Sequence, residues 1–177
     1  MVFLKSLYIV LFVCLAYTLF GSMNQEKIVI PDNAIRFRVI ASSNSEPDQK
    51  LKMKVKLAIE KKLSIILNNV DNIDSVNNAI LNNLNSLEND VLSVLKEENS
   101  IETFKINFGN NYFPEKEYNG IKYNEGGYNS LTITLGNGLG ANWWCILFPP
   151  LCLLDEQNYA ETEYKFYVKE ILSDYLK

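Results

Sequence analysis

The fold is decided by the stretch Ala34-Ile35-Arg36-Phe37-Arg38-Val39-Ile40-Ala41. Its apolar residues Ile35, Phe37 and Val39 alternate with two arginines. A period of two is typical of a β-strand, because successive side chains in a strand point to opposite faces of the sheet. We therefore predict a strand with one buried face and one face, that of Arg36 and Arg38, in water.

A helix is predicted directly after this strand. Ser45-Glu46-Pro47-Asp48 has the pattern of a capping box, in which the Ser45 hydroxyl accepts from the Asp48 amide. Pro47 falls in the first turn, where its missing N–H does no harm. Apolar residues then continue at helical spacing to Ile66, and lysines surround them at positions 50, 52, 54, 56, 61 and 62. We interpret this basic face as solvated.

A second helix is predicted from about Asp71 to Glu98. Its apolar residues step by three and four, a spacing that places them on one side of a helix. They are Ile73, Val76, Ile80, Leu84, Leu87, Val91 and Leu95.

After Ser100 the apolar period changes to two, which indicates strands around residues 104–108 and 130–135. Asn119-Gly120 is a favoured two-residue hairpin turn, and it separates two short extended segments, 116–118 and 121–123. Gly136-Asn137-Gly138-Leu139-Gly140 lacks the lysine of a phosphate loop and is interpreted as a flexible turn. Residues 160–176 predict a closing amphipathic helix.

These elements predict a single α+β domain in the order β-α-α-β-β-β-α, with a mainly antiparallel sheet and its helices on one face. The chain has 177 residues, which fits one such domain after a short N-terminal segment. In that segment, residues 1–23, Lys5 precedes an apolar run from Leu7 to Phe20. The pattern predicts a secretory signal peptide or an uncleaved N-terminal membrane anchor, with residues 24–177 exported.

Composition narrows the possible functions. The chain contains no histidine, which disfavours histidine-based triads and histidine-ligated zinc. Its net charge of −4 disfavours nucleic acid as a partner. We expect no enzyme activity and no cofactor or metal.

The segment 142–154 has an unusual composition, with both tryptophans, two cysteines, Pro149-Pro150 and no charge until Asp155. Two interpretations remain. It is a buried strand ending in a disulfide-closed turn, or a rigid apolar loop that joins the last strand to the C-terminal helix and binds a protein partner, and both can hold at once. In the second case the binding residues are Trp143, Trp144, Phe148, Pro149 and Pro150. An even pair of cysteines outside the cytosol predicts one disulfide, between Cys145 and Cys152.

Two stretches of the chain, taken together, are typical of one protein family. They are Arg36-Phe37-Arg38-Val39-Ile40-Ala41 running into Asn44-Ser45-Glu46-Pro47-Asp48-Gln49, and Asn142-Trp143-Trp144-Cys145-Ile146-Leu147-Phe148-Pro149-Pro150-Leu151-Cys152. Together with the glycine-rich turn before the second stretch, they resemble the stage II sporulation protein R family over nearly the whole exported chain.

The resemblance implies an intercellular signalling protein of endospore formation. Such a protein is exported into the space between the forespore and mother-cell membranes, free or anchored through residues 6–23. There it activates, by direct contact, a membrane-embedded aspartic protease of the mother cell that processes the precursor of the early mother-cell sigma factor.

Two alternatives stay open. A secreted hydrolase would work through carboxylates such as Glu115 and Glu117, or those of Asp155-Glu156 and Glu161-Glu163. A membrane-surface module would bind anionic lipid through the lysines of residues 50–62.

Overall fold

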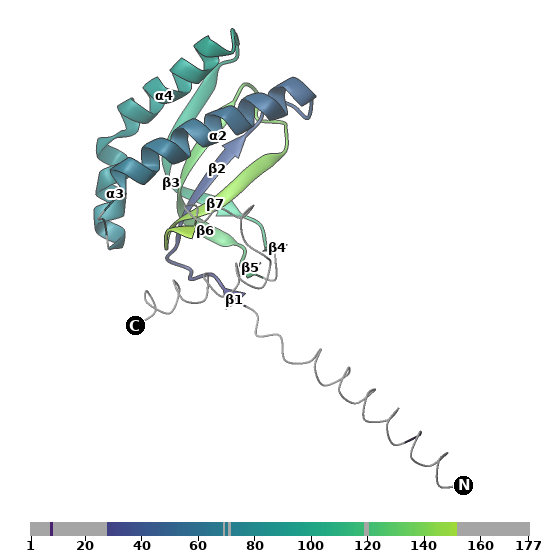
Figure 1. Ribbon diagram of the computed structural model, residues 1–177. Coiled ribbons are helices and arrows are strands. Elements are labelled where there is room, and N and C mark those ends of the chain that lie inside the picture. The colour runs from purple at the N-terminus through teal and green to yellow at the C-terminus, as the bar shows by residue number, and fades with distance from the viewer. Residues whose placement is uncertain (1–7, 9–27, 69, 71, 119–120, 152–177) are drawn as a thin grey trace.

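The computed structural model describes residues 8, 28–68, 70, 72–118 and 121–151 (Figure 1). In these ranges the chain forms strands and helices in the following order: β1 (Ile28–Val29), β2 (Ile35–Ile40), α2 (Glu46–Ile66), α3 (Ile73–Asn82), α4 (Leu84–Glu97), β3 (Phe104–Phe113), β4 (Lys116–Tyr118), β5 (Ile121–Tyr123), β6 (Gly126–Leu135) and β7 (Asn142–Phe148). The closing helix predicted for residues 160–176 lies outside the described residues.

The main sheet has four strands in the order β3-β6-β2-β7. The strand quoted from the sequence, β2, lies inside this sheet, parallel to β6 and antiparallel to β7. β3 and β6 form the longest pair, which is antiparallel and runs from Phe104 opposite Leu135 to Phe113 opposite Gly126. A mostly antiparallel sheet is therefore confirmed, although its central pair is parallel.

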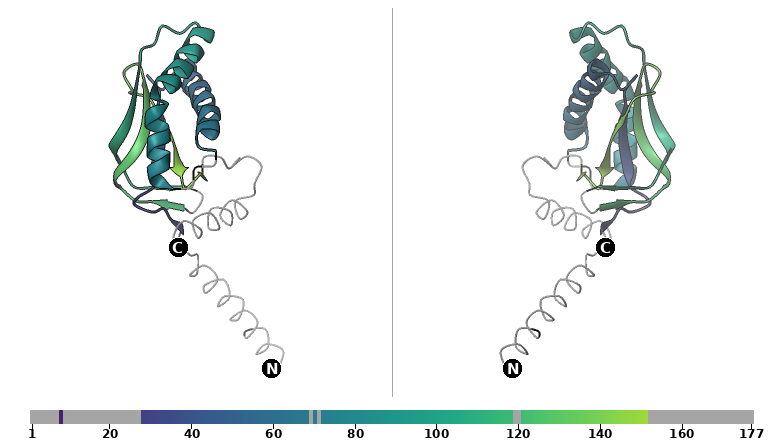
Figure 2. Two further views of the ribbon diagram at one scale, coloured as in Figure 1. Left: turned by 90° about the vertical axis from the view of Figure 1, so that its left-hand side faces the viewer. Right: turned by 90° about the vertical axis from the view of Figure 1, so that its right-hand side faces the viewer.

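All three described helices cover one face of this sheet, as predicted (Figure 2). The core lies between them, where Phe37 and Val39 of β2 meet Val55 and Ile59 of α2. These four side chains have no exposed surface. Each fully buried aliphatic or aromatic side chain of this size stabilises the fold by about 1.5–3 kcal/mol relative to its exposed state, so the alternation of β2 decides which face folds inward.

Helix α2 begins as its sequence predicts. The Ser45 hydroxyl accepts a hydrogen bond from the Asp48 backbone N–H at 3.3 Å, and Pro47 lies in the first turn. The apolar positions Leu51, Val55, Ile59 and Leu63 are buried. A capping side chain contributes about 1 kcal/mol by satisfying an N–H that has no partner within the helix.

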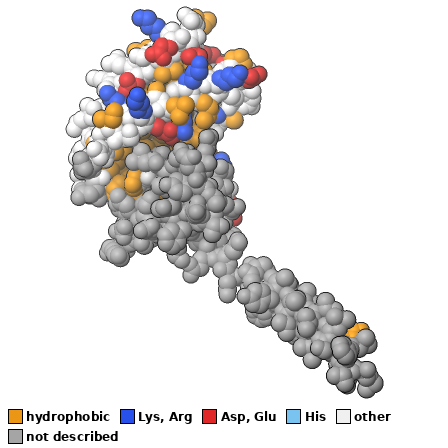
Figure 3. Space-filling view, viewed as in Figure 1, with side chains coloured by type: hydrophobic (Ala, Val, Ile, Leu, Met, Phe, Trp, Pro, Cys, Tyr) orange, Lys and Arg blue, Asp and Glu red, His pale blue; other side chains and the backbone are white. Residues whose placement is uncertain are grey.

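Most lysines of α2 reach solvent, as expected, but Lys52 is buried and three others are paired with glutamates. Lys50 pairs with Glu46, Lys54 with Glu98, and Lys56 with Glu60. Figure 3 shows basic and acidic side chains side by side over the surface of α2 and α4. Three of the six lysines are thus paired with neighbouring glutamates.

The second predicted helix is two helices. Asn83 lies between α3 and α4 with φ −112° and ψ 7°, which is outside the helical conformation. Its side-chain N–H donates to the Ala79 carbonyl oxygen at 2.8 Å. Asparagine side chains compete with the helical backbone for hydrogen bonds, and this competition divides a segment whose apolar spacing continues without a break.

A second, smaller sheet has the order β1-β5-β4. β4 and β5 are antiparallel, with Lys116 opposite Tyr123, so the predicted hairpin is confirmed by its two strands. Strand β1, which the sequence analysis did not predict, pairs with β5 in parallel. Within the described residues no helix is both long and apolar enough to cross a membrane.

The glycine-rich turn between β6 and β7, which we expected to be flexible, is held by backbone hydrogen bonds to neighbouring segments. The Gly136 N–H donates to the Thr103 carbonyl oxygen, and the Gly140 N–H to that of Ala41 at 2.9 Å. Gly138 has a φ of 65°, which residues with a side chain adopt rarely. Gly140 packs so close to the preceding loop that a Cβ there would lie 2.2 Å from the Ser43 carbonyl oxygen.

We expect Gly140→Ala to lower the free energy of unfolding by about 2–4 kcal/mol, because the clash is with backbone that cannot rotate away. The matched control is Gly109→Ala on β3, where no atom lies within 4 Å of the added Cβ and the change should stay below about 1 kcal/mol. Urea unfolding of both variants measures the difference. Equal losses would mean that the turn tolerates the added atom.

Candidate functional site

The segment with both tryptophans is an edge strand of the main sheet, not a loop. Asn142–Phe148 forms β7, and its pairs with β2 include Trp143 opposite Val39 and Trp144 opposite Arg38. For residues 142–148 the interpretation as a loop is therefore wrong, and the interpretation as a strand is confirmed. The strand is held by its pairing with β2 and by the packing of its side chains on both faces of the sheet. Among the described residues, its outer edge has no strand partner.

The two tryptophans lie on opposite faces of the sheet, as neighbours in a strand must. Trp143 packs edge-on against Phe37 on the helix side, with ring centroids 5.5 Å apart, and Lys56 Nζ lies 4.6 Å from its ring centroid. Trp144 packs edge-on against Phe113 on the other face, also at 5.5 Å. Both indoles are half-buried, so each has a ring fixed by packing and a part that a partner can contact.

The residues after the tryptophans lie deeper. Phe148 and Leu147 belong to the hydrophobic core, and Pro149 is buried, whereas Pro150 is half-buried. Phe148 and Pro150 line a cavity of about 140 Å³ with Leu67 at the end of α2. Of the five predicted partner-binding residues, Trp143, Trp144 and Pro150 thus retain accessible surface, while Phe148 and Pro149 support the strand from inside.

Cys145 is half-buried on β7. Cys152, its expected disulfide partner, lies outside the described residues. The disulfide between them therefore stays a prediction.

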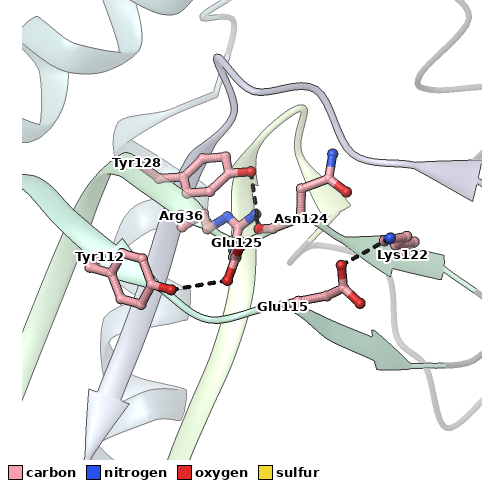
Figure 4. Close-up of polar contacts among 7 residues, drawn as sticks. All are labelled: Arg36, Tyr112, Glu115, Lys122, Asn124, Glu125 and Tyr128. Atoms are coloured by element: carbon pink, nitrogen blue, oxygen red, sulfur yellow. Dashed lines mark hydrogen bonds and ion pairs between the residues drawn. The ribbon is translucent and has the colours of Figure 1, made fainter.

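The face of the sheet opposite the three described helices carries an arginine that we expected to be in water. Arg36 is only 2% exposed, and its guanidinium carbon lies 3.4 Å from the centroid of the Tyr128 ring and 5.0 Å from that of Phe113. Its Nη2 donates to the Asn124 carbonyl oxygen at 3.1 Å, and the Tyr128 hydroxyl donates to the same oxygen (Figure 4). Burial lowers the pKa of the Arg36 guanidinium, an effect partly opposed by Tyr128.

Arg38 lies one row along the same face and is half-buried. Its guanidinium carbon is 4.7 Å from the centroid of the Phe113 ring, so the two arginines share one aromatic ring. Burial lowers the pKa of Arg38 as well. The predicted wet face of β2 is therefore wrong for Arg36 and only partly right for Arg38, because aromatic residues of other strands cover it.

Lys52 fixes the beginning of β7 to α2. It is 6% exposed, and its Nζ donates to the Gln49 side-chain oxygen at 2.6 Å and to the Ala141 carbonyl oxygen at 3.2 Å. Burial lowers the pKa of this amine. The lysine thus holds the last residue before β7 in position.

We expect Lys52→Gln to lower the free energy of unfolding by about 1–2 kcal/mol, since the Ala141 carbonyl oxygen loses a charged donor. Lys61→Gln is the control, because Lys61 is exposed and its replacement should change stability by under about 0.5 kcal/mol. Thermal unfolding of both variants decides whether the lysines of α2 are equivalent, as the sequence suggested, or not.

The acidic residues near this site are engaged in exposed surface contacts. Glu115 pairs with Lys122 at 2.9 Å, and Glu125 accepts a hydrogen bond from the Tyr112 hydroxyl at 3.2 Å (Figure 4). These contacts raise the pKa of Lys122 and of Tyr112. In the described part of the chain no group of histidine, cysteine or carboxylate residues could hold a metal ion. The hydrolase alternative gains no support from Glu115, and residues 155–163 lie outside the described ranges.

Sequence reasoning missed the arginine–aromatic group because its aromatic members come from other strands. Phe113 ends β3 and Tyr128 lies near the start of β6, far from β2 in the sequence. Tyr128 could have indicated this group, because it alternates in step with the polar Ser130 and Thr132 and so lies on the same face of the strand. A large aromatic residue on a face predicted to be wet indicates that something covers that face.

The fold and the site together define an α+β domain with an aromatic edge strand. A sequence profile of the stage II sporulation protein R family matches residues 31–158. Stage II sporulation protein R of Bacillus subtilis (strain 168) is 37% identical to the chain over 133 residues, which are 75% of this chain and 59% of that relative. The chain belongs to the stage II sporulation protein R family. The aligned part is about three-fifths of the relative's length. No solved structure matches the chain significantly.

Proposed function

We propose that this protein is an exported signal of endospore formation that activates a membrane-embedded aspartic protease by direct contact. Activation makes the protease process the precursor of the early mother-cell sigma factor. The observation that carries this proposal is membership of the stage II sporulation protein R family over residues 31–158. The apolar segment in residues 1–23 supports export, as a signal peptide or as an anchor.

We further propose that β7 is the contact with the protease. Support comes from its position at the edge of the sheet and from two half-buried tryptophans held by Phe37 and Phe113. Binding hot spots are enriched in tryptophan, and a ring already fixed by packing loses little conformational entropy on binding. Pro150, half-buried beside the cavity at the end of α2, extends the same surface.

The pairing of lysines on α2 argues against the membrane-surface alternative. Three lysines of this helix are matched by glutamates, and a fourth, Lys52, is buried. A helix on which three of six lysines are paired and one is buried gains less from anionic lipid than six free lysines would. Liposome binding that is weak and independent of salt would agree with this view.

Co-expression in a non-sporulating host tests the proposal. The full chain is produced together with the cognate membrane protease and the sigma-factor precursor, and precursor cleavage is followed by immunoblotting. We expect cleavage only when all three proteins are present, and none when a catalytic aspartate of the protease is replaced. Precursor that stays intact with all three folded proteins present would contradict the proposal.

A further inference from the structure

Two cations lie near Trp144 on the face of the sheet opposite the three described helices. Arg38 lies directly opposite Trp144 in the β2–β7 register. Lys116 Nζ, from the start of β4, is 5.0 Å from the centroid of the Trp144 ring. The tryptophan therefore has an arginine as its cross-strand neighbour and an amine near its ring, and the two cations come from different sheets.

Neither cation has an ion-pair partner in the described part of the chain. The nearby acid Glu115 is instead paired with Lys122, and Glu125 accepts from the Tyr112 hydroxyl. Elsewhere on the surface, three lysines of α2 are matched by glutamates. The positive charge beside Trp144 is thus left available for a group from outside.

A row of donors across the sheet points to the kind of group that would bind. Thr132, Arg38 and Trp144 lie side by side on β6, β2 and β7. Thr132 Oγ1, Arg38 Nε and Trp144 Nε1 are all enclosed, and none has a hydrogen-bond partner. An enclosed donor without an acceptor costs about 1–3 kcal/mol. All three groups can donate, and the row offers no negatively charged acceptor of its own.

We propose that an acidic, extended segment of the protein partner binds along β7 and places a carboxylate on the Arg38 guanidinium, with Lys116 attracting a second acidic side chain across Trp144. The inference deepens the proposed function and rests on it for the identity of the partner. Carboxylates bind a guanidinium through paired hydrogen bonds, and the edge of β7, which pairs with no other described strand, offers backbone groups to an extended chain beside it. Arg38 is half-buried, so part of its surface is accessible to such a segment.

A peptide titration tests this site apart from the protease. The chain has only two tryptophans, so Trp143→Phe in the full chain leaves Trp144 as the single fluorescent indole. The protein, in non-ionic detergent, is titrated with hexaglutamate, with hexaglutamine, and with sodium sulfate at matched ionic strength. We expect a saturable change in Trp144 fluorescence with hexaglutamate only.

Three variants in the same background assign the effect. Arg38→Gln is expected to weaken hexaglutamate binding at least tenfold, and Lys116→Gln by threefold to tenfold. Lys105→Gln is the matched control, because Lys105 is an exposed lysine on the far edge strand β3, and binding should be unchanged. Lys116 is exposed, so its variant keeps the test decisive if the Arg38 variant fails to fold.

Three results would overturn the inference: no saturable change with hexaglutamate, an equal effect of sulfate, or an equal loss in the Lys105 variant. The first would show that no such site exists, and the second would show that the site binds free anions. The third would show that the binding is general attraction between opposite charges. Precursor cleavage judges the proposed function separately. Peptide binding without precursor cleavage would contradict the proposed function but support the acidic-peptide site. Cleavage without peptide binding would support the proposed function but contradict the site.

Discussion

Replacing Arg36 with alanine is expected to lower the free energy of unfolding by about 3–5 kcal/mol, a loss typical of removing a large buried side chain. Arg36 fills the space between the Tyr128 and Phe113 rings and donates to the Asn124 carbonyl oxygen, so its removal leaves a void and an unmatched acceptor together. It also removes contacts between the guanidinium and two aromatic rings. Urea unfolding followed by circular dichroism measures the loss.

Arg36→Met separates packing from charge. Methionine keeps an unbranched apolar stem between the two rings, and it removes Nε and Nη1, which are enclosed without hydrogen-bond partners in the native protein. We expect this variant to recover most of the stability and to unfold within about 1.5 kcal/mol of the wild type. A methionine variant as unstable as the alanine variant would show that the charge and its hydrogen bond hold this face together.

Replacing Trp144 with alanine is expected to reduce precursor cleavage at least tenfold while lowering the free energy of unfolding by only about 1–2 kcal/mol. The indole is half-buried and packs on Phe113 alone among the aromatic residues described, so the sheet survives without it. Phe148→Ala should do the opposite and cost about 3–5 kcal/mol of stability, because Phe148 lies in the core.

Unfolding and precursor cleavage are measured on both variants at one temperature, chosen so that each remains folded. Under that condition the Phe148 variant should retain most of its cleavage, and the Trp144 variant should not. Cleavage that follows stability in both proteins would mean that Trp144 acts only through the fold.

Local chemistry made much of the fold predictable. The alternation of β2, the Ser45 cap and the apolar spacing of α2 each act within a few residues, so the sequence alone indicates them. The hairpin of β4 and β5 follows from its turn residues in the same way. What lay beyond prediction is the parallel pairing of β2 with β6, because about ninety residues separate these strands in the chain.

The division of the second helix shows the limit of apolar spacing. The apolar spacing from Ile73 to Leu95 continues without a break, yet the helix is interrupted at Asn83, whose side chain bonds to the Ala79 carbonyl oxygen. Asparagine occurs throughout this stretch, and the sequence does not indicate which one will turn its amide onto a carbonyl. Competition between side-chain and backbone hydrogen bonds is resolved only by the tertiary packing on either side.

The conformation of the candidate site differs from the predicted one. Prolines, cysteines and tryptophans suggested a rigid loop, yet Trp143 and Trp144 find cross-strand partners in Val39 and Arg38. Because of that pairing, the side chains of the segment point to both faces of the sheet. Phe148 packs in the core, and Trp144 keeps accessible surface. Pairing with a strand about one hundred residues away is tertiary information that composition cannot supply.

Site-specific photo-crosslinking tests most directly whether β7 contacts the protease. A photoreactive amino acid is placed at Asn142, an exposed residue at the start of β7, and as a control at Leu92, an exposed residue of α4 on the helix side. Both proteins are co-expressed with the membrane protease, and each must still support precursor cleavage. We predict a crosslink to the protease from position 142 and none from position 92. A crosslink from position 92 with none from position 142 would contradict the account and place the contact on the helices.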